Sequence, residues 1–498
     1  MKLRRLTALL LVFLMAASAC SETATAGSDE ANATASDPTA AEETVAEEPT
    51  PEEEVDARKA IPDELPEKDM NGYTFRILTR DRSDFVEDVG LELEQTGEVI
   101  DDAIIARNLA VSERFNIEFT ASYFVNGQSM PLNSVMAGDD EFDLMLGQII
   151  DVTKNATKGY YLDWYEQLPH VNLEKPWYIG NAAEALSVNN HAYIMIGEYD
   201  LDVLRFTYGM FYNKTLSDEY SLDNIYNVVK EGRWTYDYLY NLSNTVYMDL
   251  NGDGLKDEGD RLAISGDPYS AVVTYQYSFN NPLVSLDADG LPAITFNREK
   301  AYDIVTRLNA LYHESMGGFT SGWGTGGSTW MAGNLLVYTG LFQSAMGYRD
   351  LEFDFGIIPY PKFDDTQDRY YTMSDGAHGG MMVPVTVPNP EDISIIVEAL
   401  NAETYKQVVP AYYETSLKTK AARDIESAEM FDLLMDSRVF DFGYMYNDAL
   451  GGLAFVIQNL VSANSSNTES SYAGIIKTAE KKFGRVIEDY LALDTATP

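Results

Sequence analysis

Apolar positions in the first part of the chain recur with the periods of strands and helices. Residues 73–78, "YTFRIL", and 117–124, "IEFTASYF", have the length and the aromatic and β-branched content of strands. Residues 97–116 lie between them and repeat with helical spacing. The apolar stripe of this segment consists of Ile100, Ile104, Val111 and Phe115. The pattern therefore predicts a strand, an amphipathic helix and a second strand.

A polar residue interrupts this stripe, and a longer apolar run follows it. Arg107 lies within the stripe, where its guanidinium either snorkels to solvent or pairs with an acid. Residues 142–148, "FDLMLGQ", form an apolar run typical of a strand buried on both faces. Strands and helices in this order indicate a mostly parallel sheet covered by helices, and hence an α/β fold.

A second region with the same mixture of elements opens at 192–200 and 208–216. The following expected elements are a tyrosine-rich helical stretch, a hairpin turn and a helix capped by Asn297, at residues 223–248, 287–290 and 301–315. The last expected elements are a strand, a helix, a polar surface loop and a helical tail, at residues 353–363, 389–405, 462–471 and from 473 onward. A length of 498 residues fits two domain-sized units.

The N-terminus has the pattern of an export signal. Basic residues precede an apolar stretch, residues 6–17, that is too short to cross a bilayer as a stable helix. The stretch ends in "ASAC", which resembles the lipobox of bacterial lipoproteins, and residues 1–20 are predicted to be a lipoprotein signal peptide. Cys20, the single cysteine, excludes an internal disulfide and is the predicted site of lipidation. The alternative is an ordinary signal peptide with an incidental cysteine.

The charge of the chain narrows its possible partners. Residues 21–66 contain 14 acidic and 2 basic residues with few large apolar side chains, so they are predicted to be a disordered tether. The net charge of the whole chain is −44, which opposes binding to nucleic acid or to anionic lipid. Membrane contact is expected through the lipid anchor alone, and the ligand is expected to be uncharged or cationic.

A loop of twelve residues, "DLNGDGLKDEGD" at 249–260, has the spacing of a calcium loop. Gly254 occupies position 6, where such loops turn sharply. The expected ligands are Asp249, Asn251, Asp253, the carbonyl of Leu255, Asp257 and Asp260. Clustered carboxylates repel one another unless a cation lies between them, and a single loop favours a structural Ca²⁺ over a calcium sensor. A solvated Asp/Gly turn is the alternative.

Several blocks together resemble the extracellular solute-binding proteins of family 1, the lipoprotein receptors of bacterial ABC importers for sugars. They are "GYTFRIL", "GEVIDDAIIARNLAVSERFNIEF", "FYNK", "KEGRWTYDYL", "MAGNLLVYTGLF" and "FDFGIIPYPKFDD". The resemblance implies two α/β lobes joined by a hinge, with the ligand in the cleft. Lobe 1 would comprise 67–200 and 375–425, and lobe 2 would comprise 201–374 and 426–498 with the calcium loop. It further implies a monomer on the outer face of the cytoplasmic membrane that delivers a saccharide to the transmembrane permease subunits.

The candidate ligand-binding residues are aromatic and polar side chains in loops and at strand ends. Trp323 and Trp330 lie in the glycine-rich segment 322–330, and the alternative is that one of them anchors this loop by packing. The remaining candidates are Gln148, Asp200, Asp375 and His378 near strand ends or expected crossings, and Phe342 in a block where the family places an aromatic residue.

The sequence also limits the enzymatic alternatives. Its four histidines are dispersed, and it has no G-x-S-x-G motif, no P-loop and no cysteine nucleophile, so we expect a binding protein and not an enzyme. Two other readings stay open: a surface enzyme acting on glycosides through a carboxylate pair, and an adhesion lipoprotein stiffened by calcium. Peptides also stay open as ligands, because two-lobed receptors serve several kinds of solute.

Overall fold

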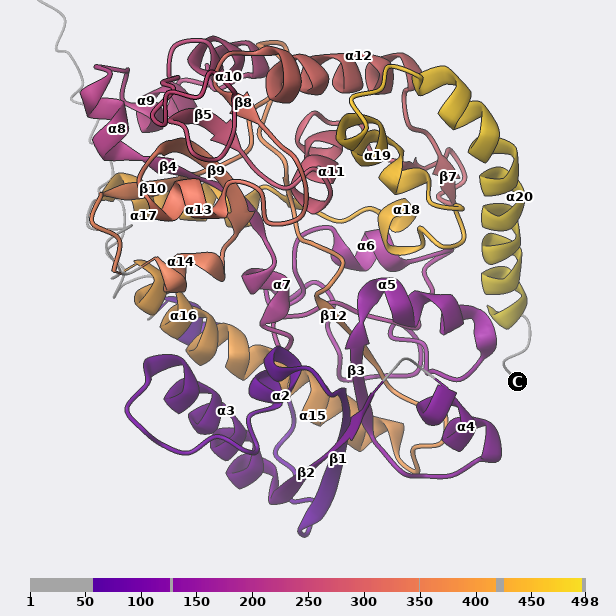
Figure 1. Cartoon of the computed structure of the whole chain (residues 1–498). Helices are drawn as coiled ribbons and strands as arrows, with labels where there is room; N and C mark the ends of the chain where they lie inside the picture. The colour runs from indigo at the N-terminus through magenta and orange to yellow at the C-terminus, as the bar shows by residue number, and fades with distance from the viewer. Residues whose placement is uncertain (1–56, 126–128, 349, 418–424, 495–498) are drawn as a thin grey trace, which may run out of the picture. The chain divides into compact units, whose positions relative to one another are not determined.

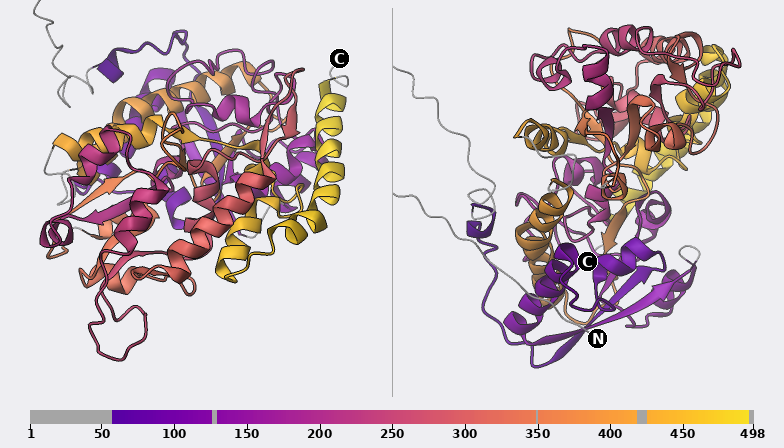
Figure 2. Two further views of the ribbon diagram at one scale, coloured as in Figure 1. Left: turned by 90° about the horizontal axis from the view of Figure 1, so that it is seen from above. Right: turned by 60° about the vertical axis from the view of Figure 1, so that its left-hand side comes forward.

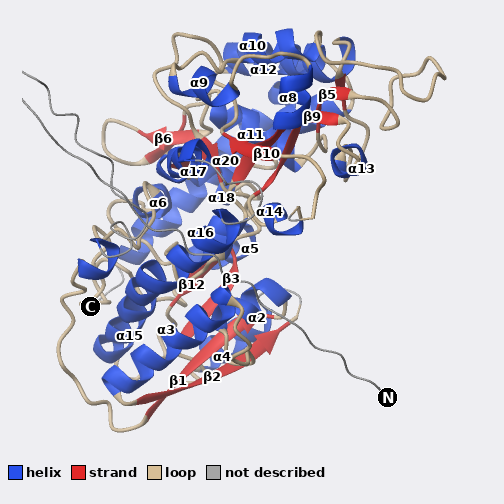
Figure 3. Cartoon of the chain, turned by 90° about the vertical axis from the view of Figure 1, so that its left-hand side faces the viewer, coloured by secondary structure: helices blue, strands red, loops and turns tan. Residues whose placement is uncertain are grey.

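The computed structural model describes residues 57–125, 129–348, 350–417 and 425–494 (Figure 1). The predicted signal peptide, Cys20 and residues 21–56 of the predicted tether lie outside the described residues. The described chain contains two main sheets, and we use lobe 1 and lobe 2 for the parts built around them (Figure 3). The α/β prediction is confirmed.

Lobe 1 is built on a four-stranded sheet of order β12-β3-β1-β2. Its strands are β1 (Tyr73–Arg80), β2 (Ile117–Phe124), β3 (Leu144–Gln148) and β12 (Gly379–Met382). Strand β1 pairs in parallel with β2 and β3, with Tyr73 opposite Ile117 and Ile77 opposite Leu144. Strand β12 is antiparallel to β3 and returns from lobe 2. The three strands predicted for this region are confirmed, with a mostly parallel sheet.

Lobe 2 is built on a mixed five-stranded sheet of order β10-β4-β9-β5-β8. Its strands are β4 (Tyr208–Asn213), β5 (Leu262–Ser265), β8 (Gly318–Phe319), β9 (Leu335–Leu341) and β10 (Phe355–Ile358). Strand β10 is shorter than the predicted strand 353–363, because Pro359 and Pro361 lack the N–H groups that continue a ladder. Two smaller pairings are the predicted hairpin of β6 (Val284–Leu286) with β7 (Pro292–Ile294), and β11 (Thr372–Met373) with β13 (Arg438–Val439).

Helices cover both sheets, and none of those described is long and apolar enough to cross a membrane. The helices up to the end of lobe 2's sheet are α2 (Ser83–Val89), α3 (Val99–Phe115), α4 (Ser129–Ala137), α5 (Ile149–Val152), η1 (Thr153–Lys158), α6 (Ala182–Leu186), α7 (Asp202–Arg205), α8 (Lys214–Glu219), α9 (Ile225–Lys230), α10 (Tyr236–Ser243), α11 (Ser270–Ser278), α12 (Arg298–Asn309), η2 (Ala310–Glu314), α13 (Gly327–Met331) and α14 (Ser344–Gly347). The later helices are α15 (Pro390–Glu403), η3 (Thr404–Val408), α16 (Val409–Leu417), α17 (Ile425–Asp436), α18 (Phe442–Met445), η5 (Leu453–Phe455), α19 (Val456–Ser462) and α20 (Thr468–Asp494).

Local sequence signals account for the ends of several helices. Asn297 caps α12 as predicted, since its side chain accepts the Lys300 N–H at 3.0 Å. Asn116 ends α3 in the left-handed region at φ 51°, a conformation that asparagine tolerates well. The predicted helical tail is confirmed, although α20 begins at Thr468, inside the segment predicted to be a surface loop.

Arg107 on α3 neither snorkels to solvent nor forms an ion pair with a described acid. Its side chain is 1% exposed and donates to the backbone carbonyls of Asp88 and Val89. Its guanidinium carbon lies 4.7 Å from the ring centroid of Tyr199. The sequence expectation was wrong because backbone carbonyl oxygens accept the hydrogen bonds of the guanidinium and an aromatic ring faces its charge. These contacts take the place of the solvent or carboxylate that was expected.

The predicted tether ends earlier than expected. Ile61 and Leu65 pack against the core of lobe 1, and Asp63 forms an ion pair with Arg114 at 2.5 Å. These apolar and paired side chains explain why residues 61–65 join the folded lobe and do not continue the tether.

The chain passes between the lobes at several places. It leaves lobe 1 through residues 199–207 and returns through 374–379, and Thr207 and Ser374 form a bridge where these two segments meet. Helix α20 contacts both lobes, because Tyr472 near its start packs on Phe296 and Tyr490 near its end packs on Tyr193 (Figures 1 and 2). The strands of each sheet fall within the predicted lobe ranges, while the predicted boundaries themselves stay a prediction.

Candidate functional site

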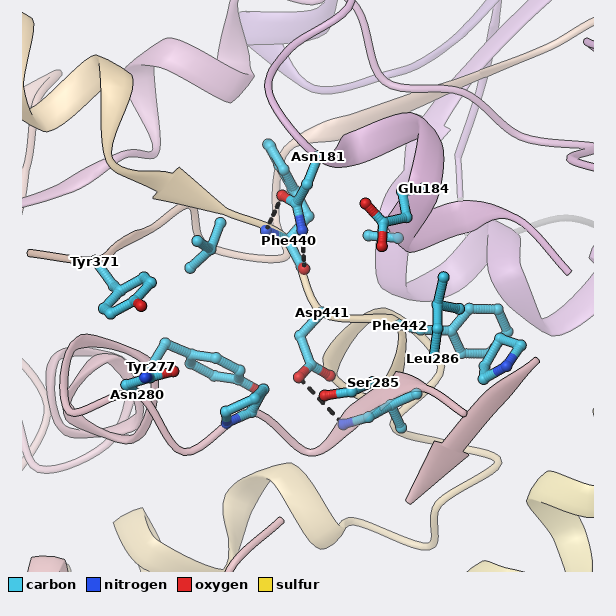
Figure 4. A pocket seen from close by; sticks show the side chains of 15 residues that line it. Asn181, Glu184, Tyr277, Asn280, Ser285, Leu286, Tyr371, Phe440, Asp441 and Phe442 are labelled. Atoms are coloured by element: carbon cyan, nitrogen blue, oxygen red, sulfur yellow. Dashed lines mark hydrogen bonds between the residues drawn. The ribbon is translucent and has the colours of Figure 1, made fainter. Parts of the chain in front are cut away.

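A cavity of about 220 Å³ lies between lobe 1 and lobe 2 (Figure 4). Its lobe 1 side comes from α6 and the residue before it, and its other sides come from the α11–β7 region and the segment after β13. The lining residues that carry the argument are Asn181, Glu184, Tyr277, Tyr371, Asp441 and Phe442. Aromatic and polar side chains thus converge between the lobes, which is typical of a small-molecule site.

Asn181 holds the two sides of the cavity together. Its side-chain amide donates to the carbonyl of Phe440 at 3.1 Å, and its side-chain oxygen accepts the N–H of Phe440 at 3.0 Å. This double hydrogen bond joins the start of α6 to the end of the β13 segment. Glu184 lies three residues further on, so one turn of α6 places it beside the same cavity.

Asp441 fixes the backbone on one side of the cavity through hydrogen bonds. Its carboxylate accepts the N–H groups of Leu283 at 2.7 Å and Tyr444 at 2.9 Å, and it caps α18. Burial raises the pKa of Asp441 to about 6, although the backbone hydrogen bonds oppose this rise. Because backbone donors occupy both oxygens, this carboxylate shapes the cavity and is not free to act as an acid or base.

Tyr277 and Glu184 are polar residues of the cavity whose side chains make no hydrogen bond with another described residue. Tyr277 is 4% exposed, and its hydroxyl has no partner within the described chain. Burial, followed by the nearby charge of Asp441, raises its pKa well above the usual value, so the hydroxyl stays protonated. The carboxylate of exposed Glu184 lines the same cavity without an ion pair or hydrogen bond to the described residues. The carboxylate of Glu184 is therefore available to a ligand, whereas the Tyr277 hydroxyl is buried behind the surface of the cavity.

The other rings at the cavity are partly engaged. Phe442 stacks on Tyr446 with centroids 4.0 Å apart. The guanidinium of Arg369 lies 4.7 Å from the ring centroid of Tyr371, one of the lining residues. One face of each ring is therefore covered by protein, and a ligand would meet the other face or the edge.

His378, a predicted site residue, lies in a smaller adjoining cavity. This cavity, of about 10 Å³, shares Tyr277, Phe440 and Asp441 with the larger one. His378 is 1% exposed, and its Nδ1 donates to the carbonyl of Gly379 at 2.8 Å. Burial lowers the pKa of His378 to about 4, so the ring is neutral near pH 7. His378 therefore lies behind the candidate site and does not line the larger cavity.

The other polar candidates lie at the crossings, away from the cavity lining. Asp375 accepts the Tyr208 hydroxyl at 2.9 Å, and burial raises its pKa. Gln148 accepts hydrogen bonds from Arg80 and Arg82. Asp200 is 1% exposed, and its Oδ2 atom has no hydrogen-bond partner among the described residues. The structure brings none of these three into the lining of the cavity, and their roles in binding stay predictions.

The aromatic candidates differ in exposure, because the structure buries two of them and exposes the third. Trp330 is 0% exposed and packs on Tyr338, Phe353 and other rings of lobe 2. Phe342 is 1% exposed and stacks on Phe431 at 4.7 Å. The packing interpretation therefore applies to both, because neither ring is open to a ligand in this structure. Trp323 is 79% exposed and does not line the cavity.

The acidic loop has the internal bonding expected of its sequence. Asp249 accepts the N–H groups of Gly252 at 2.6 Å and Gly254 at 3.0 Å, and Asp253 accepts that of Leu255. Gly254 has φ 74°, which fits its place at the sharp turn. Asp260 is buried and accepts the Leu250 N–H at 3.2 Å. These bonds are local and tie the side chains to the backbone of the loop. No three of its carboxylates are among the groups of described residues close enough to share a metal ion, so calcium binding stays a prediction.

Comparison with known proteins identifies the fold. No family model matches the sequence, and no curated protein matches it. The structure is similar to the GacH receptor of Streptomyces glaucescens GLA.O, with 12% identity and a TM-score of 0.52 over 84% of this chain and 99% of that one. UspC of M. tuberculosis has 12% identity and a TM-score of 0.52, covering 82% and 100% of the two chains.

A third similar structure is the maltose-maltodextrin binding protein of Alicyclobacillus acidocaldarius. It has 12% identity and a TM-score of 0.50, and the match covers 82% of this chain and 100% of that one. The chain therefore has the two-lobed fold of the sugar-binding solute receptors, as the resemblance of its sequence blocks implied.

Sequence reasoning missed most of the cavity. Asp441 could have been suspected as a helix cap before "FGYM", but Asn181, Glu184 and Tyr277 stand in no recognisable motif. They meet only because three segments distant in sequence converge between the lobes (Figure 4).

Proposed function

We propose that this protein is an extracytoplasmic receptor that binds a saccharide between its lobes and delivers it to an ABC importer without chemical change. The observation that carries this proposal is the interlobe cavity. It combines aromatic side chains with a buried tyrosine hydroxyl and an exposed carboxylate, neither of which has a partner among the described residues. Sugar recognition needs such a combination, because ring C–H surfaces pack on aromatics and each buried hydroxyl needs a hydrogen-bond partner.

The similar structures support the same function, and the size of the cavity bears on how much of a ligand it can hold. The similar structures include a maltose-maltodextrin binding protein and a receptor solved in complex with acarbose. The cavity volume of about 220 Å³ lies below the usual range for ligand sites, which begins at about 300 Å³. A cavity of this size suits one terminal unit of an oligosaccharide, with the remaining units outside it.

Isothermal titration of residues 57–498 against a panel of mono- and oligosaccharides tests the proposal. We expect saturable binding, a ligand-induced change in small-angle scattering and recovery of intact sugar afterwards. Peptides serve as the alternative ligand class in the same panel. Release of a hydrolysed product would identify a glycoside-active enzyme, and binding only to polymers or cells would identify an adhesion lipoprotein.

The proposed location depends on Cys20. The basic start, the short apolar stretch and "ASAC" support cleavage before Cys20 and its lipidation, which would hold the receptor on the outer face of the cytoplasmic membrane. Cys20→Ser should release or misprocess the protein. Normal cleavage and unchanged membrane association of this variant would contradict the lipoprotein assignment.

The acidic loop is proposed to hold one structural Ca²⁺. Asp249, Asn251, Asp253, Asp257 and Asp260 would supply side-chain oxygens, and Leu255 would supply a carbonyl. Bound calcium would neutralise the mutual repulsion of these carboxylates and stiffen this part of lobe 2. Elemental analysis of the native protein tests this directly.

A further inference from the structure

The interlobe cavity has a charge asymmetry that the general receptor function does not require. Two of its lining residues, Glu184 and Asp441, are acidic, and no lysine or arginine of the described chain lines it. Backbone donors hold the carboxylate of Asp441, whereas that of Glu184 is free of described partners. Arg369 lies beside Tyr371 and keeps its charge there, but it does not line the cavity. The free charge facing a ligand is therefore negative.

Tyr277 supplies a second polar group beside the cavity, which a ligand can reach once the side chains around it adjust. Its hydroxyl is buried and lacks a partner among the described residues, and the side chain lines both the larger and the smaller cavity. A buried hydroxyl without a hydrogen bond is costly, so a ligand hydroxyl at this position would recover that cost. Tyr277 and Glu184 come from opposite lobes, so one ligand that contacts both would favour the closed arrangement.

We propose that this cavity selects a saccharide unit bearing a cationic amino group, with Glu184 accepting hydrogen bonds from the ammonium and Tyr277 bonding to a neighbouring hydroxyl. This inference rests on the proposed receptor function and specifies its ligand class. An acidic sugar would place its carboxylate near Glu184, and no described lysine or arginine lines the cavity to offset the repulsion, so uronic acids should bind more weakly than amino sugars.

The experiment compares two ligands that differ at the amino group. Titration calorimetry is run with the β-1,4-linked disaccharide of glucosamine, at a pH where its amines are protonated, and with its N-acetylated counterpart. The wild type should bind the amino form more tightly by about three- to tenfold, because a partly exposed carboxylate gives a modest charge-assisted contribution. High ionic strength should narrow this difference.

Matched variants assign the effect to particular atoms. Glu184→Gln should abolish the preference, while Glu174→Gln, the same change at an exposed acid of lobe 1 that does not line the cavity, should leave it intact. Tyr277→Phe should weaken both ligands about fivefold or more without lowering the unfolding temperature, because the deleted hydroxyl has no protein partner to lose.

The possible outcomes are distinguishable. Equal binding of the two disaccharides, or a preference that survives Glu184→Gln, would overturn the cationic selectivity. Binding of neutral saccharides in those cases would leave the receptor function standing. Failure of the whole saccharide panel to bind would overturn both the selectivity and the proposed function.

Discussion

Two groups of aspartates in this molecule have opposite surroundings. In the acidic loop at 249–260, where only Asp260 of the four aspartates is buried, carboxylates accept backbone N–H groups a few residues away, as Asp253 does from Leu255 and Asp257 from Gly259. These bonds are local and need no partner from the rest of the fold. The loop can therefore be recognised from its own twelve residues.

The second group lies where the chain first crosses between the lobes. Asp88, Asp200 and Asp202 are each at most 1% exposed, and one oxygen from each lies within 4.8 Å of the others. Arg205 donates to Asp88 at 2.5 Å and to Asp202 at 3.1 Å. Arg82 donates to Asp202 at 2.9 Å. These acids depend on guanidinium groups supplied by two separate segments.

The pKa values of the buried aspartates reflect their removal from water. Burial, together with the charge of Asp88, raises the pKa of Asp202 to about 8, against the opposing effect of Arg205. Burial and the charge of Asp202 raise that of Asp200 well above its usual value. A carboxylate removed from water must gain a cation or keep its proton, whereas an exposed one can use nearby amides and solvent.

Removing the shared cation from the buried group should have the largest effect. We expect Arg205→Met to lower the free energy of unfolding by about 3 to 5 kcal/mol, because it leaves Asp88 and Asp202 without their common partner. Chemical denaturation measures the change. Arg233→Met is the matched control, since its ion pairs are exposed, and it should leave the free energy of unfolding nearly unchanged. Equal effects would contradict the distinction.

The second largest expected effect is the change of the free energy of unfolding with pH. The folded-state pKa values of Asp200 and Asp202 exceed those of the unfolded chain, so the folded state binds more protons between pH 4 and pH 8. Their contribution is therefore most favourable below pH 4 and is lost as the pH rises toward 8. Asp200→Asn removes one such group, so the free energy of unfolding of the variant should decrease less steeply between pH 4 and pH 8.

Denaturation curves at several pH values test this sign. The variant and the wild type should have similar stability near pH 4, and the variant should be more stable by about 1 to 3 kcal/mol near pH 8. Its amide can donate to the neighbouring carboxylates, so the substitution preserves the packing. A variant that lost stability equally at both pH values would show that the role of Asp200 is steric and not electrostatic.

The same contrast explains what could be predicted from the sequence. The strands of lobe 1, the hairpin between β6 and β7 and the cap at Asn297 depend on neighbours within a few residues, and all were recovered. Local bonding makes such features visible in one stretch of chain. The length of β10 was wrong because the ladder stops before two prolines.

The candidate site depends on convergence and was largely missed. Asn181 meets Phe440 across 259 residues, and no local pattern encodes that pairing. The segment 322–330 was singled out for its two tryptophans, and the structure buries Trp330 while exposing Trp323. A glycine-rich stretch does not by itself tell which of its aromatic residues packs inward, because the packing partners lie on other strands.

Effects in the acidic loop should be smaller than those at the crossing. Asp249→Ala removes an acceptor for two backbone N–H groups and a proposed calcium ligand, so we expect a loss of about 1 to 2 kcal/mol in the presence of calcium. Chelation of the wild type should lower the melting temperature in the same direction, and the variant should no longer respond to the chelator. An unchanged melting curve with EDTA, together with no calcium in elemental analysis, would contradict the proposed metal site.

The smallest effect on stability should come from substituting Trp323. This residue lies in a segment that is hydrogen-bonded to the acidic loop. Glu258 accepts the Gly326 N–H at 3.1 Å and the Ser328 hydroxyl at 2.7 Å, so the backbone is held without help from the exposed ring. Trp323→Ala should change the free energy of unfolding by less than about 0.5 kcal/mol, whereas buried Trp330→Ala should cost about 3 to 5 kcal/mol. Saccharide titration of Trp323→Ala then separates its roles. Weaker binding at unchanged stability would assign the ring to ligand contact, and a loss of stability like that of Trp330→Ala would contradict its exposed position.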